Sequence, residues 1–281
     1  ITGGAYSNTM RFVYSYRNCD VYTLGGNADG FAPKLGAGKG NVFYGCYSWE
    51  NSDDGWDSYD KDSLTYNLTY TNCACWNNGD PTIFTGEYDY NNGNALDTDL
   101  LLVELISKKD SSFASNYKNG KFSLPCGSFI STTQGTLSIA NWKSKYDGNP
   151  NGFKFGSVNT TSSCVRTVTN CLAFGHSSKG FDNNNSSCTA YLSNCISYDN
   201  GYNYYMPPFT LKKFSNILSF SGASSNKLPS GYTASIPSSS KQAQIRSTVN
   251  ATVSSITTQC KNNVIPGEVY SFFRVKKLFL N

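Results

Sequence analysis

The chain has 281 residues, of which 15% are charged and 38% hydrophobic, and its formal net charge is +4. An all-β fold of this length is ordinarily a single unit, and the abundance of Asn, Ser, Gly, Thr and Tyr favours short strands joined by polar turns. The small charge and the lack of a Lys/Arg run argue against a nucleic-acid groove or a polybasic membrane patch, and no apolar run is long enough to span a bilayer. These properties remain compatible with a mildly basic groove for an acidic polymer.

A repeat built on cysteine and on Asp-Gly-aromatic sequences begins near the start of the chain. Cys19, Cys46 and Cys73 follow one another at steps of 27 residues, and Cys171 and Cys195 are 24 residues apart. Such steps match one coil of a parallel β-helix, with three short strands and three turns. We therefore predict an all-β, right-handed parallel β-helix, a solenoid with an insertion and a C-terminal capping helix.

Equivalent residues of successive coils should form ladders, because neighbouring strands stack at about 4.8 Å. We expect one inward aromatic ladder made of Phe31, Trp56, Phe153 and Phe181. On an ideal strand Asp29 would share the face of Phe31. That placement conflicts with an exposed aspartate, because Phe31 is expected to point inward. A bend or bulge at Gly30 and Gly55 would let the aspartate point outward, because glycine permits backbone angles that other residues avoid.

The period breaks over about residues 80–150, which we take as an irregular insertion within a β-helix of residues 1–239. Residues 99–106 within it read as a short helix or a buried strand. Residues 240–281 are expected to form a helix and a tail packed on the solenoid. In this region five residues recur at near-helical spacing and predict an amphipathic helix over one end of the solenoid: Ile245, Val249, Val253, Ile256 and Cys260.

The N-terminal residues 1–6 resemble the middle of a coil, so an open strand edge there should favour self-association. They do not form a signal peptide, and we expect the numbered chain to start after processing or truncation.

Ten cysteines are unusual in a cytosolic protein, and their spacing does not suggest zinc. Asn-X-Ser/Thr sequons begin at Asn67, Asn159, Asn184, Asn185 and Asn250. Together these features favour a secreted, extracellular glycoprotein. The cysteines are compatible either with disulfides or with inward ladders of thiols, since stacked coils bring equivalent Cα atoms within disulfide range.

Carboxylates gather around the second Asp-Gly-aromatic sequence. Asp53, Asp54 and Asp57 lie within five positions, and Asp29 occupies the register of Asp54 one coil earlier. An acidic turn in solvent is the simpler interpretation of one Asp-Asp pair. Two coils in register favour a calcium site instead, because crowded oxygen ligands need a cation to offset their repulsion.

Lys154 follows Asn151-Gly152-Phe153 and therefore falls in the ladder of Asp57, beside this expected metal. Nearby positive charge and partial burial disfavour a charged ammonium, which would make Lys154 a base at alkaline pH. Most lysines are solvated surface groups, and only the repeat register distinguishes this one. The single histidine, His176, has no Ser or Cys arrangement nearby, so a structural or surface role is favoured.

Several motifs resemble polysaccharide lyase family 9, the pectate and related pectin-backbone lyases, and they occur in the family's order. They are Asn27-Ala-Asp29-Gly-Phe-Ala-Pro-Lys34, Trp49-Glu-Asn-Ser-Asp53-Asp54-Gly-Trp-Asp57, Asn151-Gly-Phe-Lys154-Phe-Gly and Asn170-Cys-Leu-Ala-Phe-Gly with Gly180-Phe-Asp182. The resemblance covers roughly residues 1 to 205 apart from the insertion. It implies a right-handed β-helix that binds Ca²⁺ through Asp29, Asp53, Asp54 and Asp57, with Lys154 as the Brønsted base.

The implied reaction is calcium-assisted β-elimination on polygalacturonate, an acidic plant cell-wall polysaccharide, which gives 4,5-unsaturated products. Lys179, Arg166 and Lys34 are candidates to bind neighbouring uronates, although solvated surface residues are the simpler interpretation. A rhamnogalacturonan-backbone lyase and a non-catalytic extracellular β-helix that binds glycans are the alternatives. A hydrolase is disfavoured, because inversion needs two separated carboxylates whereas these are bunched. Trp49, Tyr59, Trp76, Tyr202 and Tyr204 suit sugar stacking or core ladders equally well.

Overall fold

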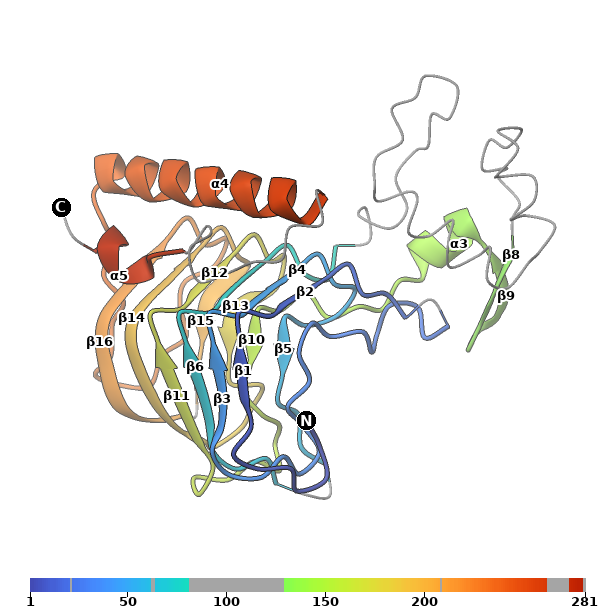
Figure 1. Ribbon diagram of the computed structural model, residues 1–281, viewed down its shortest axis with the longest axis horizontal. Helices are drawn as coiled ribbons and strands as arrows, with labels where there is room; N and C mark the ends of the chain where they lie inside the picture. Colours follow the sequence, from blue (N-terminus) through green and yellow to red (C-terminus); the bar gives the residue numbers. More distant parts are fainter. Residues whose placement is uncertain (21, 62–63, 81–128, 208, 262–272, 280–281) are drawn as a thin grey trace.

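The computed structural model describes residues 1–281 except 21, 62–63, 81–128, 208, 262–272 and 280–281. Its body is a parallel β-helix in which each coil contributes short strands to three faces (Figure 1). The first face contains β1 (Thr9–Arg11), β3 (Asn41–Tyr44), β6 (Leu68–Thr71) and β11 (Val165–Thr169). The second contains β2 (Tyr14–Tyr16), β4 (Tyr47–Trp49), β7 (Ala74–Trp76) and β12 (Leu172–Phe174).

Two long strands, β14 (Thr189–Tyr198) and β16 (Thr210–Phe220), bend from the first face into the second and join both into one sheet. The third face is a separate parallel sheet of β5 (Trp56–Asp57), β10 (Phe153–Lys154), β13 (Lys179–Asp182) and β15 (Tyr202–Tyr205). The expected aromatic ladder is confirmed on this face. Ring centroids of neighbouring residues are 4.6 to 5.0 Å apart along Phe31, Trp56, Phe153, Phe181 and Tyr204.

The core also contains a column of thiols. Cys46, Cys73, Cys171 and Cys195 lie in equivalent positions of successive coils and are buried. All nine cysteines within the described residues are free. In this structure the inward ladder of thiols is therefore present in place of disulfides.

Cys19 does not belong to this column, contrary to the predicted repeat. Tyr14 pairs with Tyr47, a step of 33 residues, whereas Phe31 pairs with Trp56, a step of 25. The turn between β2 and Phe31 is thus eight residues longer than its equivalent in the next coil. Its asparagine, Asn18, donates from Nδ2 to Asn51 Oδ1 at 2.7 Å, so the Asn18-Cys19 pair aligns with Asn51 and its successor.

The expected C-terminal helix is present as α4 (Ser239–Lys261), followed by α5 (Val275–Leu278), but α4 lies along the flank of the solenoid (Figure 1). Arg246 packs on Tyr198 and Phe220 of the last coils, and Cys260 makes a hydrogen bond with Tyr16 of the first. Fourteen residues of helix span about 21 Å, which matches four to five inter-strand spacings of about 4.8 Å.

The helix covers a second aromatic stack on this flank. The stack contains Tyr16, Trp49, Trp76, Phe174, Tyr198 and Phe220, with centroid separations of 4.4 to 5.8 Å. Ile245, Val249 and Ile256 of α4 are buried in the same cluster. The final coil is covered instead by Leu228, Tyr232 and Ala234, which pack on the main core.

The two ends of the stretch between β7 and β10 meet at one place on the solenoid. A Cβ atom on Gly79 would lie 2.2 Å from Pro150 Cα, so the two backbones touch. The described part of this stretch contains β8 (Phe129–Thr132), β9 (Gly135–Ser138) and α3 (Ile139–Ser144). The helix or strand expected at residues 99–106 lies outside the described residues.

None of the helices in the described part of the chain is both long and apolar enough to cross a membrane.

Candidate active site

Strand alternation on the third face places a column of polar residues directly beside the core aromatic ladder. Side chains of successive strand residues point to opposite faces, so each residue that follows a ladder aromatic points outward. Pairing of β5, β10, β13 and β15 aligns the outward residues of four successive coils in one column: Asp57, Lys154, Asp182 and Tyr205. The predicted register of Lys154 with Asp57 is thereby confirmed.

A column of glycines lies between each ladder aromatic and the polar residue two positions before it, which is an aspartate in two of the four coils. Gly30, Gly55, Gly152 and Gly180 stand between them in successive coils, and a Cβ atom on any of these glycines would meet a neighbouring atom at 1.8 to 2.7 Å. The glycines are therefore required by the close approach of the next coil. This differs from the expected reason, because none of the four has a positive φ.

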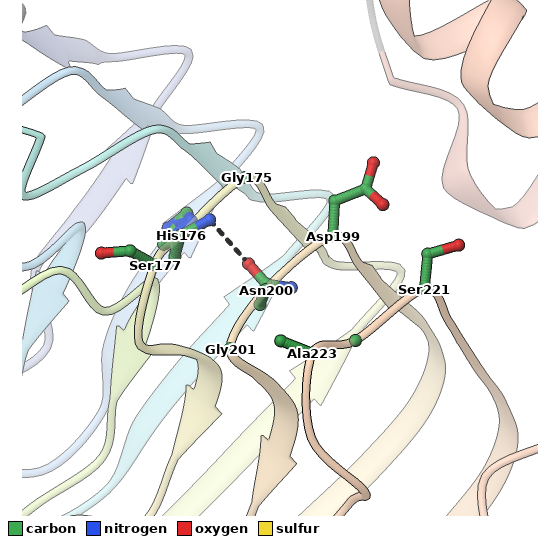
Figure 2. A pocket seen from close by; sticks show the side chains of 9 residues that line it. Gly175, His176, Ser177, Asp199, Asn200, Gly201, Ser221 and Ala223 are labelled. Atoms are coloured by element: carbon green, nitrogen blue, oxygen red, sulfur yellow. Dashed lines mark hydrogen bonds between the residues drawn. The ribbon is translucent and has the colours of Figure 1, made fainter.

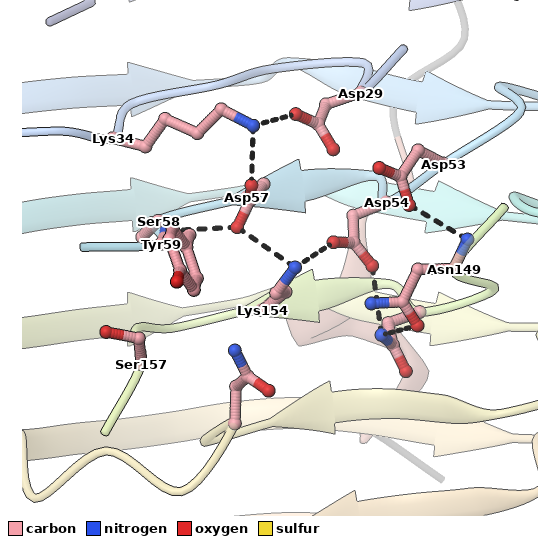
Figure 3. Close-up of polar contacts among 12 residues, drawn as sticks. Asp29, Lys34, Asp53, Asp54, Asp57, Ser58, Tyr59, Asn149, Lys154 and Ser157 are labelled. Atoms are coloured by element: carbon pink, nitrogen blue, oxygen red, sulfur yellow. Dashed lines mark hydrogen bonds and ion pairs between the residues drawn. The ribbon is translucent and has the colours of Figure 1, made fainter. Parts of the chain in front are cut away.

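Three of the four predicted calcium ligands gather in one cluster beside the outward column of the third face (Figure 3). Carboxylate oxygens of Asp29, Asp54 and Asp57 all lie within 4.8 Å of one another. Asp53 is adjacent but falls outside that group, and its Oδ1 accepts a hydrogen bond from the Asn149 backbone N–H at 2.9 Å. The sequence predicted that all four aspartates converge; three of them do, and the fourth, Asp53, lies next to the cluster.

Two lysines connect these carboxylates into a chain of ion pairs (Figure 3). Lys34 Nζ lies 2.7 Å from both Asp29 Oδ2 and Asp57 Oδ2. Lys154 Nζ lies 2.8 Å from Asp54 Oδ2 and 3.4 Å from Asp57 Oδ1. Lys34, which we expected to bind a uronate, is therefore part of the cluster itself.

Burial and mutual repulsion perturb the carboxyl groups. Burial, followed by the charge of Asp57, raises the pKa of Asp29 to about 6. Burial and then Asp29 raise the pKa of Asp53 to about 7, and burial also raises the pKa of Asp54 well above its ordinary value. The ionised cluster is therefore electrostatically strained, and positive charge would relieve it.

The lysines respond in the opposite direction. Burial lowers the pKa of Lys154, but the carboxylates of Asp54 and Asp57 raise it by more, so the net pKa lies above its ordinary value. The pKa of Lys34 is raised in the same way by Asp57 and Asp29. Lys154 can accept a proton only when the charge of its carboxylate partners is offset by something else.

The residues of this cluster fit a calcium ion. All four donors are carboxylates, the class of ligand that calcium prefers. Four carboxylates and two ammonium groups leave a formal charge of −2, which a divalent cation would balance. Asp29 Oδ1 is also buried without a hydrogen-bond partner among the described residues, as expected of an oxygen available to a cation.

Three residues near the return point of the insertion support the cluster and were missed as site residues. Asn151 donates from Nδ2 to Asp54 Oδ1 at 2.9 Å and to Asn149 Oδ1 at 2.6 Å, while Tyr146 donates from its hydroxyl to the Ser52 carbonyl. Asn151 stands in the register of Asp54, so the repeat contained a signal for it. The contact from Asn149 to Asp53 uses a backbone N–H, which has no sequence signature.

The other two predicted uronate-binding residues have different environments. Lys179 lies on the outer face, where its Nζ contacts Asp182 Oδ2 at 2.9 Å and a quarter of its side chain is exposed. Arg166 is fully buried, and its guanidinium donates to the carbonyls of Phe155, Tyr66 and Thr65. The prediction that Arg166 contacts substrate is wrong for this structure, because the side chain points into the core.

His176 stands in a ladder of buried asparagines beside an open surface hollow (Figure 2). Its ring contacts Asn78 at 3.5 Å and the Phe174 carbonyl at 2.9 Å, and its backbone N–H donates to Asn200 Oδ1. Burial lowers its pKa to about 3. These contacts assign His176 a structural role, in line with the role favoured from its sequence context.

Comparison with known proteins identifies relatives of this site-bearing fold. Residues 1–96 match the family described as "Pel9A-like, right handed beta helix region". Pectate lyase L of Dickeya chrysanthemi is 31% identical over 202 residues, which cover 72% of this chain and 32% of that protein. The pectate lyase L of Dickeya dadantii is 32% identical over the same shares of both chains.

A solved structure gives the same result. The crystal structure of pectate lyase Pel9A superposes with a TM-score of 0.53 at 26% identity, covering 86% of this chain and 47% of that one. These matches confirm the right-handed β-helix and the resemblance to polysaccharide lyase family 9. The chain spans about a third of the length of the curated relatives named above.

Proposed function

We propose that this chain, whose residues 1–96 match the Pel9A-like family of right-handed β-helices, cleaves a pectic polyuronate by calcium-assisted β-elimination with Lys154 as the base. The observation that carries the proposal is the pairing of Lys154 with Asp57 in adjacent coils, with Lys154 Nζ also 2.8 Å from Asp54. A binding protein would need the acidic cluster alone. The lysine in the same column supplies a group that can accept a proton.

The reaction requires removal of the weakly acidic C5 proton of a uronate. Neutral Lys154 takes this proton at Nζ, the C4–C5 double bond forms, and the C4–O bond breaks with its electron pair on the departing oxygen. A calcium ion held by Asp29, Asp53, Asp54 and Asp57 would stabilise the negative charge that develops on the substrate carboxylate. Because the same carboxylates hold the Lys154 proton in this structure, we infer that calcium binding also frees Lys154 to act as a base.

Homogalacturonan is the proposed substrate, and its location in plant cell walls implies action outside the producing cell. The test measures the ultraviolet absorbance of unsaturated uronate during incubation with polygalacturonate or rhamnogalacturonan, with calcium and then with a chelator. We expect a calcium-dependent rise with polygalacturonate. A rise only with rhamnogalacturonan would reassign the substrate, and no rise with either polymer by calcium-loaded protein would overturn the proposed function.

The role of Lys154 is tested with Lys154→Met and a matched control, Lys213→Met, which removes an exposed lysine on β16. Loss of a general base lowers the rate by roughly 10²-fold or more. We expect this loss in Lys154→Met with calcium binding retained by calorimetry, and no change in Lys213→Met. Activity in Lys154→Met close to that of the native chain would exclude it as the base.

A further inference from the structure

The outward column that contains Lys154 continues beyond the acidic cluster over two more coils. Lys154 pairs with Asp182, and Asp182 pairs with Tyr205. Two inter-strand spacings separate Lys154 from Tyr205, about 10 Å along the solenoid. A linear polymer bound at Lys154 and lying along this column would therefore pass over Tyr205.

Tyr205 forms a supported aromatic surface with a cation beside it. Lys179 Nζ lies 5.0 Å from the centre of the Tyr205 ring, and Tyr202 contacts the same ring edge-on with centroids 5.2 Å apart. Both tyrosines are partly exposed, whereas their neighbour Tyr204 is buried in the core ladder. The ring is held in position without being enclosed.

The charges at this point match a uronate. The Lys179 ammonium has three N–H donors, one of which is directed at Asp182 at 2.9 Å, and a quarter of the side chain is exposed. A partly exposed ammonium can accept a carboxylate, and the aromatic ring can contact the apolar face of a pyranose ring. A neutral sugar would use only the ring, so the pair selects for an acidic unit.

We propose that Tyr205 and Lys179 form a binding subsite for a uronate unit of the polymer, about two coils from the reacting unit, with Tyr202 as a positioning residue. This subsite rests on the proposed function, since it assumes that the polymer lies along the column of Lys154. Lys179 binds the carboxylate and Tyr205 supports the ring. The subsite contributes affinity for long chains and takes no part in proton transfer.

The experiment compares Tyr205→Ala, Tyr205→Phe and Lys179→Met with Tyr191→Ala, a control that removes an exposed tyrosine from β14. Steady-state kinetics use polygalacturonate. Tyr205→Ala and Lys179→Met should raise KM for the polymer about tenfold, with kcat retained. Tyr205→Phe, which keeps the ring, should raise KM less than Tyr205→Ala does, and Tyr191→Ala should behave like the native chain.

Binding is measured separately by calorimetry with hexagalacturonate in the Lys154→Met background, where turnover is expected to be slow. Weaker binding on adding Tyr205→Ala, with an unchanged urea midpoint, would support the subsite even if the native chain proved inactive. Native affinity and native KM in both Tyr205→Ala and Lys179→Met would overturn the subsite and leave the proposed function intact. A change in kcat with native KM and native affinity for hexagalacturonate would also overturn it, since the subsite is proposed to contribute affinity for the bound chain.

Discussion

Replacing Arg166 with methionine should destabilise the fold without directly altering substrate binding. Arg166 is fully buried and donates to the carbonyls of Phe155 and Thr65 at 2.9 and 3.1 Å, and also to that of Tyr66. Each buried acceptor left without a donor costs about 1–3 kcal/mol, so three would cost roughly 3–9 kcal/mol. Removing a buried charge recovers several kcal/mol of desolvation, which leaves a net loss of about 3 kcal/mol.

The assay is urea denaturation followed by circular dichroism, with the free energy of unfolding extrapolated to water. We expect Arg166→Met to lose about 3 kcal/mol, because methionine keeps the volume but provides no donor. Lys213→Met, which removes an exposed lysine on β16, should change stability by less than about 1 kcal/mol. Native stability of Arg166→Met combined with a raised KM would refute the structural role and restore the predicted contact with substrate.

Three further predictions concern other parts of the molecule. His176 has a pKa of about 3 in the folded chain against an ordinary 6.5, so its contribution to stability is complete above pH 6.5 and is lost as the pH falls toward 3. Between pH 7 and pH 5 the native chain should therefore lose about 2 kcal/mol of its free energy of unfolding through His176, and His176→Asn should not show this part of the loss. Urea titration at both pH values measures the loss, and an equal loss in His176→Asn would contradict the prediction. Calcium at a hundred times its Kd should raise the melting temperature of the native chain by roughly 5 °C and that of Asp29→Asn by much less. Scanning calorimetry measures both shifts in melting temperature. Trp76→Ala should cost about 3–5 kcal/mol in urea unfolding and expose α4 to limited proteolysis, whereas resistance equal to that of the native chain would argue against support of the helix by this stack.

The outward column was predictable because its register follows from the core beside it. Large aromatics recur one position before Asp57 and Lys154, and only their stacking aligns the polar residues that follow. Local sequence is sufficient here, since the coil length and strand alternation are both regular. The acidic cluster could be located for the same reason.

The errors arose where the local pattern was incomplete. Cys19 was aligned with Cys46 because both are cysteines at a coil-length step. The eight-residue extension of the turn shifts the register of that coil, so the two residues do not align. Arg166 was expected on the surface because it is charged, although Val168, two positions later on β11, shares its inward face. The path of α4 along the flank depended on a second aromatic stack whose outward direction the helical spacing does not reveal.

The contact between Gly79 and Pro150 has a consequence for the architecture of the coil. Joining these two residues directly would remove residues 80–149 and shorten the step from Trp56 to Phe153 from 97 residues to 27. That length equals the step between Cys46 and Cys73, which are aligned in adjacent coils. The solenoid is thus continuous across this contact, and this position behaves as a modular junction where a segment can be exchanged while the coils on either side keep their alignment.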